Sequence, residues 1–165
     1  MGSSASKRVK NCLSNSTQFD SACDSAFSHC LSLTQHAFEG VFPYQLNTAS
    51  DHIHNLISKS NAPQPLIQKW VPTPPDRSQV DSALRRVTSP DQILGPVVFK
   101  AWALQLYTEA VLSGAGKAVM VRVPVGVAGI VGIGALTRPS PQLLGTFVGA
   151  YSLGVALSIF LGLSA

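Results

Sequence analysis

The sequence predicts an all-α membrane protein with a small helical amino-terminal region, an interfacial amphipathic helix and a carboxy-terminal two-helix transmembrane hairpin. First, residues 123–165 contain a single charged side chain, Arg138, which lies at a proline corner between two glycine-rich apolar runs. Second, charged residues are 12% of the chain, about half the share usual in soluble domains. Third, apolar side chains recur at helical spacing in several stretches before residue 113.

Residues 1–16 predict a flexible, basic amino terminus. The start fits the pattern for N-myristoylation of Gly2, with Ser6 at the selective position; a vector-derived start and a chance match are the alternatives. One acyl chain binds a bilayer only marginally, so a second signal, such as the carboxy-terminal spans, is needed. Three basic residues would add attraction to an anionic leaflet: Lys7, Arg8 and Lys10. Cys12 is interpreted as an ordinary thiol rather than an acylation site.

Residues 17–60 predict a helical soluble region. The first helix is expected at about 17–39, stopped by Gly40 and Pro43, and the second at 49–60, capped by Thr48 or Ser50. The first helix is amphipathic, so its apolar face should pack against this chain, a partner or the membrane surface. That face carries Cys23, Phe27, Cys30 and Phe38.

Residues 61–78 predict a proline-rich linker with little regular structure. Trp70 within it is expected to dock onto the body of the protein or at the level of the lipid head groups. A short helix is predicted at 79–87.

Residues 79–116 are expected to contain this short helix and then an interfacial one. Ser89 resembles a helix cap, and Gly95-Pro96 would restart or kink the helix. Within 96–113 one side is apolar and the other polar, which favours a helix lying on the membrane. The alternative, a transmembrane span, would place Glu109 in lipid at a cost of several kcal/mol. The apolar side consists of Phe99, Trp102, Ala103, Leu106, Tyr107 and Ala110.

Residues 117–165 predict the transmembrane hairpin, with spans at Ala118–Leu136 and Leu143–Leu163. Arg122 lies close enough to the boundary to reach the head groups. Pro124 is tolerated if the helix starts at Val121 and kinks it if the helix starts earlier. Small residues allow close helix packing in lipid, either inside the hairpin or between copies. The predicted packing residues are Gly126, Gly129, Gly132, Gly145, Gly149 and Gly154.

A single hairpin puts both termini on one side of the membrane. The distribution of Lys and Arg, together with acylation of Gly2 by a cytosolic enzyme, predicts that the amino-terminal region is cytosolic. The weakly hydrophobic spans suit the outer membrane of a mitochondrion or plastid, or the endoplasmic reticulum.

No catalytic, cofactor or metal motif of adequate specificity is present. Cys23 and Cys30 are seven residues apart, which does not match structural zinc spacing. Residues 113–117 resemble part of a phosphate loop but lack its glycine offset and hydroxyl, so they are interpreted as a helix end and hinge. His52 and His54 are interpreted as a solvated helix edge. The basic residues lack the interleaved aromatics of a nucleic-acid site.

The sequence therefore predicts a non-enzymatic anchor, adaptor or accessory subunit of a membrane complex, with the bilayer and other proteins or further copies as partners. One alternative is an oligomeric membrane-shaping or transport-related hairpin protein. Another is a small membrane enzyme, for which only Lys100, Tyr107 and Glu109 offer polar groups.

Overall fold

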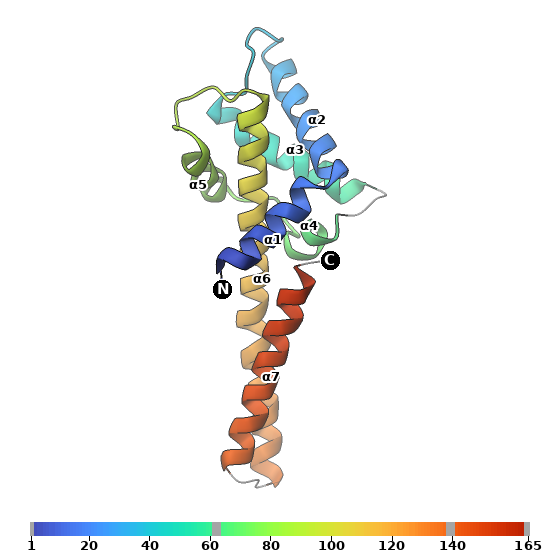
Figure 1. The fold of residues 1–165 in the computed structure, drawn as a ribbon, viewed down its shortest axis with the longest axis vertical. Helices are drawn as coiled ribbons and strands as arrows, with labels where there is room; N and C mark the ends of the chain where they lie inside the picture. The colour runs from blue at the N-terminus through green and yellow to red at the C-terminus, as the bar shows by residue number, and fades with distance from the viewer. Residues whose placement is uncertain (1, 61–63, 138–140, 164–165) are drawn as a thin grey trace. The chain divides into compact units, whose positions relative to one another are not determined.

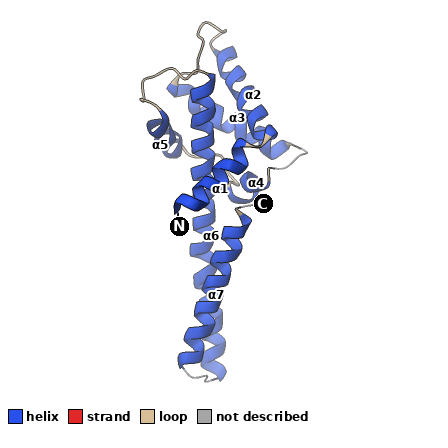
Figure 2. Cartoon of the chain, in the orientation of Figure 1, coloured by secondary structure: helices blue, strands red, loops and turns tan. Residues whose placement is uncertain are grey.

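The computed structural model describes residues 2–60, 64–137 and 141–163, and at 2, 3, 132–137 and 141 it describes the backbone alone. These ranges are helical, as predicted, and their one β pairing is a bridge between Val41 and Leu94. Figure 1 traces the elements in chain order, and Figure 2 shows the dominance of helix. They are α1 (Gly2–Ser14), α2 (Thr17–Leu33), the 3-10 turn η1 (Pro43–Gln45), α3 (Leu46–Lys59), α4 (Pro65–Trp70), α5 (Arg77–Val87), α6 (Pro96–Thr137) and α7 (Pro141–Gly162).

The chain divides into two compact units, Met1–Leu112 and Ser113–Ala165. We call the first the helical unit and the second the apolar helix pair. Helix α6 begins in the helical unit and continues without a break in its secondary structure into the apolar helix pair. The predicted helix end and hinge at 113–117 is therefore wrong, because glycine weakens a helix without ending it.

The core of the helical unit forms where α2 and α3 meet the first part of α6. Trp102, Tyr107 and Phe99 are its largest fully buried side chains. Phe27 meets Phe99 edge to face at a centroid distance of 5.4 Å, and Phe19 meets Tyr107 at 5.6 Å. Such pairs add to the free energy gained by burying the rings.

The apolar face of α6 between Pro96 and Leu112 is covered by protein, so the predicted interfacial helix is wrong. All six residues of the predicted lipid-facing side are buried in the unit. Its polar groups also have protein partners: the Tyr107 hydroxyl donates to the Ser50 carbonyl at 2.9 Å, and Glu109 pairs with Arg86 at 3.0 Å. An apolar stripe specifies burial but not whether protein or lipid covers it.

The amino terminus forms helix α1 instead of the predicted flexible segment. Val9 and Leu13 are four residues apart, so they share one helix face, and both are fully buried. Two apolar residues are too few to predict an amphipathic helix from the sequence. The basic residues lie on the remaining surface of this helix.

Helix α2 ends at Leu33, six residues before the predicted end. Gln35 and His36 have φ values of 51° and 56°, and the His36 amide donates to the Leu31 carbonyl at 2.9 Å. Left-handed residues cannot continue a right-handed helix, so the chain turns before reaching Gly40. Gly40 instead lies against Ile93 and Leu94, where a Cβ atom would have no room.

Helix α3 starts at Leu46, three residues before the predicted start, and neither Thr48 nor Ser50 caps it. Pro43 opens the preceding turn, and the Gln45 side chain accepts from the Phe42 amide at 3.0 Å. The same side chain donates to the Cys30 carbonyl at 2.9 Å, which ties this turn to α2. A long-range hydrogen bond of this kind leaves no local sequence signal.

A third of the predicted proline-rich linker, six of its 18 residues, forms helix α4. Pro65 begins α4, a position where proline is tolerated, and Leu66, Ile67 and Trp70 are buried. Trp70 therefore docks onto the body of the protein, one of its two expected places. The segment from Val71 to Asp76 is irregular, as predicted, while residues 61–63 lie outside the described ranges.

Helix α5 is close to the predicted helix at 79–87 and starts two residues earlier. Asp76 caps it by accepting from the Gln79 amide at 2.9 Å, and Gln79 accepts from the Asp76 amide at 3.1 Å. Ser89 does not cap a helix. The chain turns there and α6 begins only at Pro96.

The apolar helix pair consists of Ser113–Thr137 of α6 and the whole of α7, which lies alongside that part of α6 (Figure 1). Pro124 lies inside α6, so the Met120 carbonyl has no amide partner four residues on. Residues 138–140, including Arg138 of the predicted corner, lie outside the described part of the chain.

Candidate functional site

Two described helices are long and apolar enough to cross a membrane. The qualifying segments are Pro96–Val131, whose most apolar 18 residues have a mean hydropathy of 1.4, and Gln142–Gly162, whose most apolar 18 residues have 1.8. The start of the first segment belongs to the core of the helical unit. The apolar stretch that follows it, from Ala118 onward, and α7 are thus the candidate functional site.

Most large apolar side chains in the described part of this helix pair are at least partly exposed, whereas Ile159 and Leu163 are buried. Protein buries only 6% of the most apolar window of either helix, whereas a soluble core helix would be mostly covered. Many of these side chains are more than half exposed: Met120, Val121, Val125, Leu143, Phe147, Leu153, Leu157 and Leu161. A continuous exposed apolar surface of this kind needs lipid or another protein to cover it.

Tyr151 contacts the facing helix in the described part of the pair. Its ring lies directly on Gly126, leaving no room for a Cβ atom, and its hydroxyl approaches the Arg122 carbonyl at 3.4 Å. Tyr151 also lines a cavity of about 270 Å³ with Gly154, Ser158 and neighbouring residues. Gly126 was predicted from the sequence, but Tyr151 was not, because a ring packed on glycine leaves no signal in residue spacing.

Four of the other predicted packing glycines face open space. A Cβ atom added at Gly129, Gly145, Gly149 or Gly154 would meet no heavy atom within 4 Å. Gly132 belongs to the backbone-only part of α6, so its packing lies outside what is described. Among the five predicted glycines whose surroundings are described, Gly126 is the one that touches the facing helix.

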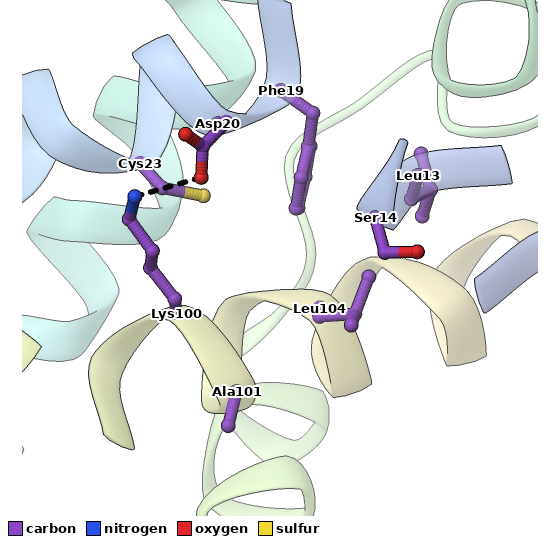
Figure 3. A pocket seen from close by; sticks show the side chains of 8 residues that line it. All are labelled: Leu13, Ser14, Phe19, Asp20, Cys23, Lys100, Ala101 and Leu104. Carbon is purple, nitrogen blue, oxygen red and sulfur yellow. Dashed lines mark hydrogen bonds and ion pairs between the residues drawn. The ribbon is translucent and has the colours of Figure 1, made fainter. Parts of the chain in front are cut away.

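The three polar residues considered for a membrane enzyme do not converge. Lys100 holds Asp20 at 2.7 Å (Figure 3). It also holds Asp24, at 2.9 Å. Glu109 binds Arg86 and Gln105, and Tyr107 is buried against Ser50. Each side chain is engaged in a separate structural contact.

A small pocket of about 170 Å³ lies between α1, α2 and α6, beside the Lys100 ion pairs (Figure 3). Cys23 lines it together with Leu13, Phe19 and Leu104. Burial, reinforced by the charge of Asp20, raises the pKa of the Cys23 thiol to about 12. The thiol is therefore protonated at neutral pH and is a poor nucleophile.

Cys30 is also a packed thiol, and burial raises its pKa to about 11. Within the described ranges, no three His, Cys, Asp or Glu side chains come close enough to hold a metal ion. Comparison with protein-family models, curated proteins and solved structures found no match.

His29 of α2 and His52 of α3 form a stacked pair that the sequence analysis missed. Their rings are parallel within 6°, with centroids 4.5 Å apart, and the Ser25 hydroxyl lies 3.5 Å from His52 Nε2. Burial, followed by the proximity of His29, lowers the pKa of His52. The pair lies where α2 meets α3, so its charge affects that packing.

We expect acid to weaken the folded state through this pair. A lowered pKa means that the folded protein binds fewer protons than the unfolded chain, so stability is full above the ordinary His pKa of 6.5 and falls as the pH drops through it. The urea midpoint of His52→Asn should therefore depend less on pH between 7.5 and 5 than that of the wild type. His36→Asn, a change in an exposed loop, is the control; equal pH slopes for wild type and His52→Asn would contradict the prediction.

Proposed function

We propose that the protein is a non-catalytic integral membrane protein whose helical unit serves as an anchor, adaptor or accessory subunit of a membrane complex. The apolar helix pair would insert as a transmembrane hairpin and hold the helical unit at the bilayer. The observation that supports this most is the outward-facing apolar surface of both helices, which stands in contrast to the covered core of the helical unit.

The lengths of the two apolar helices support their insertion into a bilayer. A bilayer core requires about 20 helical residues. Helix α7 has 22 residues, and α6 continues for about that length after Lys117. Lys117 and Arg122 lie near the start of the first span, where their charged groups would reach the head groups. Ion-paired Glu109 falls before this stretch, so no carboxylate would enter lipid.

Membrane orientation is part of the proposal. Basic residues precede the first span, which favours a cytosolic amino terminus. Gly2 is the first residue of α1 and the proposed acylation site, which would add a second, weak attachment to the same leaflet. The organelle would be one whose membrane accepts weakly hydrophobic hairpins: a mitochondrial or plastid outer membrane, or the endoplasmic reticulum.

Purification from native membranes in mild detergent tests the adaptor role. We expect the protein in a stoichiometric complex larger than a monomer or a homo-oligomer. The Gly2→Ala variant should remain in the membrane fraction, because the hairpin contributes most of the free energy of membrane binding. A difference between this variant and the wild type in the rate of exchange between membranes would reveal the contribution of the acyl chain. Recovery only as a partnerless monomer would contradict the proposal.

A second candidate function, oligomerisation for membrane shaping or transport, is favoured by the open glycine surfaces. Gly129 and Gly149 have no neighbour inside the described hairpin, so another copy could approach them closely. Changing both to Leu should abolish crosslinked oligomers, whereas changing the adjacent Ala128 and Ala150 to Leu should have less effect. A wild-type protein that crosslinks only as a monomer would eliminate this candidate.

A further inference from the structure

Six large apolar side chains lie at the end of α2, in η1 and the two loops joined by the Val41–Leu94 bridge, and at the start of α6. We call this surface the aromatic end, and its members are Leu33, Phe38, Phe42, Tyr44, Ile93 and Val97. Phe42 is half-buried, while the exposed fractions of the others are 56% for Leu33, 48% for Phe38, 72% for Tyr44, 44% for Ile93 and 79% for Val97. Isolated exposed apolar residues are ordinary, but a cluster of this size marks an interaction surface.

The aromatic end is built on a fixed frame. Phe42 joins Phe38 edge to face at 4.9 Å and stacks on Tyr44 at 5.6 Å. The Val41 and Leu94 amides and carbonyls exchange hydrogen bonds of 2.9 and 2.8 Å, which ties the loop after α2 to the loop before α6. A surface already ordered loses little entropy when a partner binds.

The two loops that carry the aromatic end contain acidic residues and no Lys or Arg. No Lys or Arg occurs between Lys10 and Lys59, a stretch that contains four acidic residues, although the whole chain has a net charge of +4. Glu39 and Asp91 are exposed in the two loops that carry the aromatic end. His36 is the other titratable side chain of the first loop.

Two of the basic groups of the neighbouring helices, Lys100 and Arg86, are ion-paired, while Arg85 is exposed in the last turn of α5. Lys100, one turn from Val97, is held by two carboxylates, so that cluster has a net charge of −1. Arg86 pairs with Glu109, which lies twelve residues, or about 18 Å, along α6 from Val97. The surface is thus apolar and aromatic with an acidic surround, a poor match for an anionic membrane.

We propose that the aromatic end binds an apolar segment of a partner protein that carries Lys or Arg beside its apolar side chains. The proposal rests on the adaptor function and names its docking surface. Exposed Tyr and Phe are the side chains enriched at the centres of protein interfaces. The acidic surround would select and orient the basic groups of the partner.

The test uses the full chain in phosphatidylcholine nanodiscs and two fluorescein-labelled helical peptides. Both peptides carry Leu at helical spacing, one with flanking Lys and the other with Glu at the same positions. We expect the Lys peptide to bind about tenfold or more tightly than the Glu peptide, and more weakly at high salt. Empty nanodiscs give the blank.

Variants assign the binding to the aromatic end. Phe38→Ser with Tyr44→Ser should weaken binding of the Lys peptide about tenfold or more, and Glu39→Lys with Asp91→Lys should reverse the preference between peptides. Leu56→Ser, at a partly exposed position on α3, is the matched control and should leave binding unchanged. All these positions are surface positions, so the variants should retain the fold.

Three results would overturn the inference: equal affinity for the two peptides, insensitivity to the Phe38 and Tyr44 changes, or attachment of this surface to phosphatidylserine vesicles or to a second copy instead. If the peptides fail to bind while a native membrane complex persists, the adaptor function stands and its docking surface lies elsewhere. Absence of any native complex would refute the adaptor function itself.

Discussion

Four lysines placed in the apolar helix pair are expected to release the protein from membranes. The changes are Val125→Lys, Val131→Lys, Leu153→Lys and Leu157→Lys, all at positions at least half exposed in the structure. A lysine near the centre of a span costs about 2.5–3.5 kcal/mol, so four cost about 10–14 kcal/mol. This exceeds what weakly hydrophobic, glycine-rich helices can offset.

Alkaline carbonate extraction measures the outcome. Wild type should stay in the membrane pellet, and most of the four-lysine variant should move to the supernatant or be degraded. A control variant with lysine at four exposed positions of the helical unit, Ser28, Ser32, Thr48 and Asn55, adds the same charge and should stay in the pellet. A wild-type protein found in the supernatant would refute the membrane proposal.

Trp102→Ala should destabilise the helical unit by about 3–5 kcal/mol, the usual cost of removing a fully buried Trp or Phe side chain. Trp102 is fully buried, packs against Phe99 at 5.3 Å, and donates to the Val80 carbonyl at 3.4 Å. A small domain has a total stability of about 5–15 kcal/mol, so this loss would leave the unit marginal.

Modification of Cys23 and Cys30 by a thiol reagent reports this loss in the full chain. Both thiols are buried with raised pKa values, so they should react only when the unit opens. Trp102→Ala should lower the urea concentration at which the two thiols become modified. Trp102→Phe should lower it less. Val97→Ala changes an exposed residue of the same helix and should alter stability by less than about 0.5 kcal/mol. If Trp102→Ala behaves like Val97→Ala, the proposed core is wrong.

Two properties of α6 were predicted from the sequence: which residues form its apolar face, and what covers that face. The residues of its apolar face from Phe99 to Ala110 were identified correctly, but their environment was wrong, because protein covers them. The spacing of apolar residues shows which side of a helix is shielded from water. It gives no information about whether protein or lipid shields that side. The partners of this face, such as Phe19 and Phe27, lie some 70 to 90 residues away in the chain.

The local errors have a similar cause. The early end of α2 depends on left-handed conformations at Gln35 and His36. Gln and His are not residue types from which such a turn is predicted. The burial of α4 depends on docking of Leu66 and Ile67, although prolines around them suggested a linker. In both cases tertiary contacts determined a conformation that local propensity left open.

The sequence by itself determined that the protein is helical and that its last third consists of two apolar helices, because apolar content and helical spacing are properties of neighbouring residues. Only the tertiary structure decided that the Trp102 face belongs to a protein core, that Tyr151 packs on Gly126, and that Phe38 and Tyr44 stay exposed beside an acidic surround. These depend on contacts between residues distant in sequence, whose register is set by packing and turns.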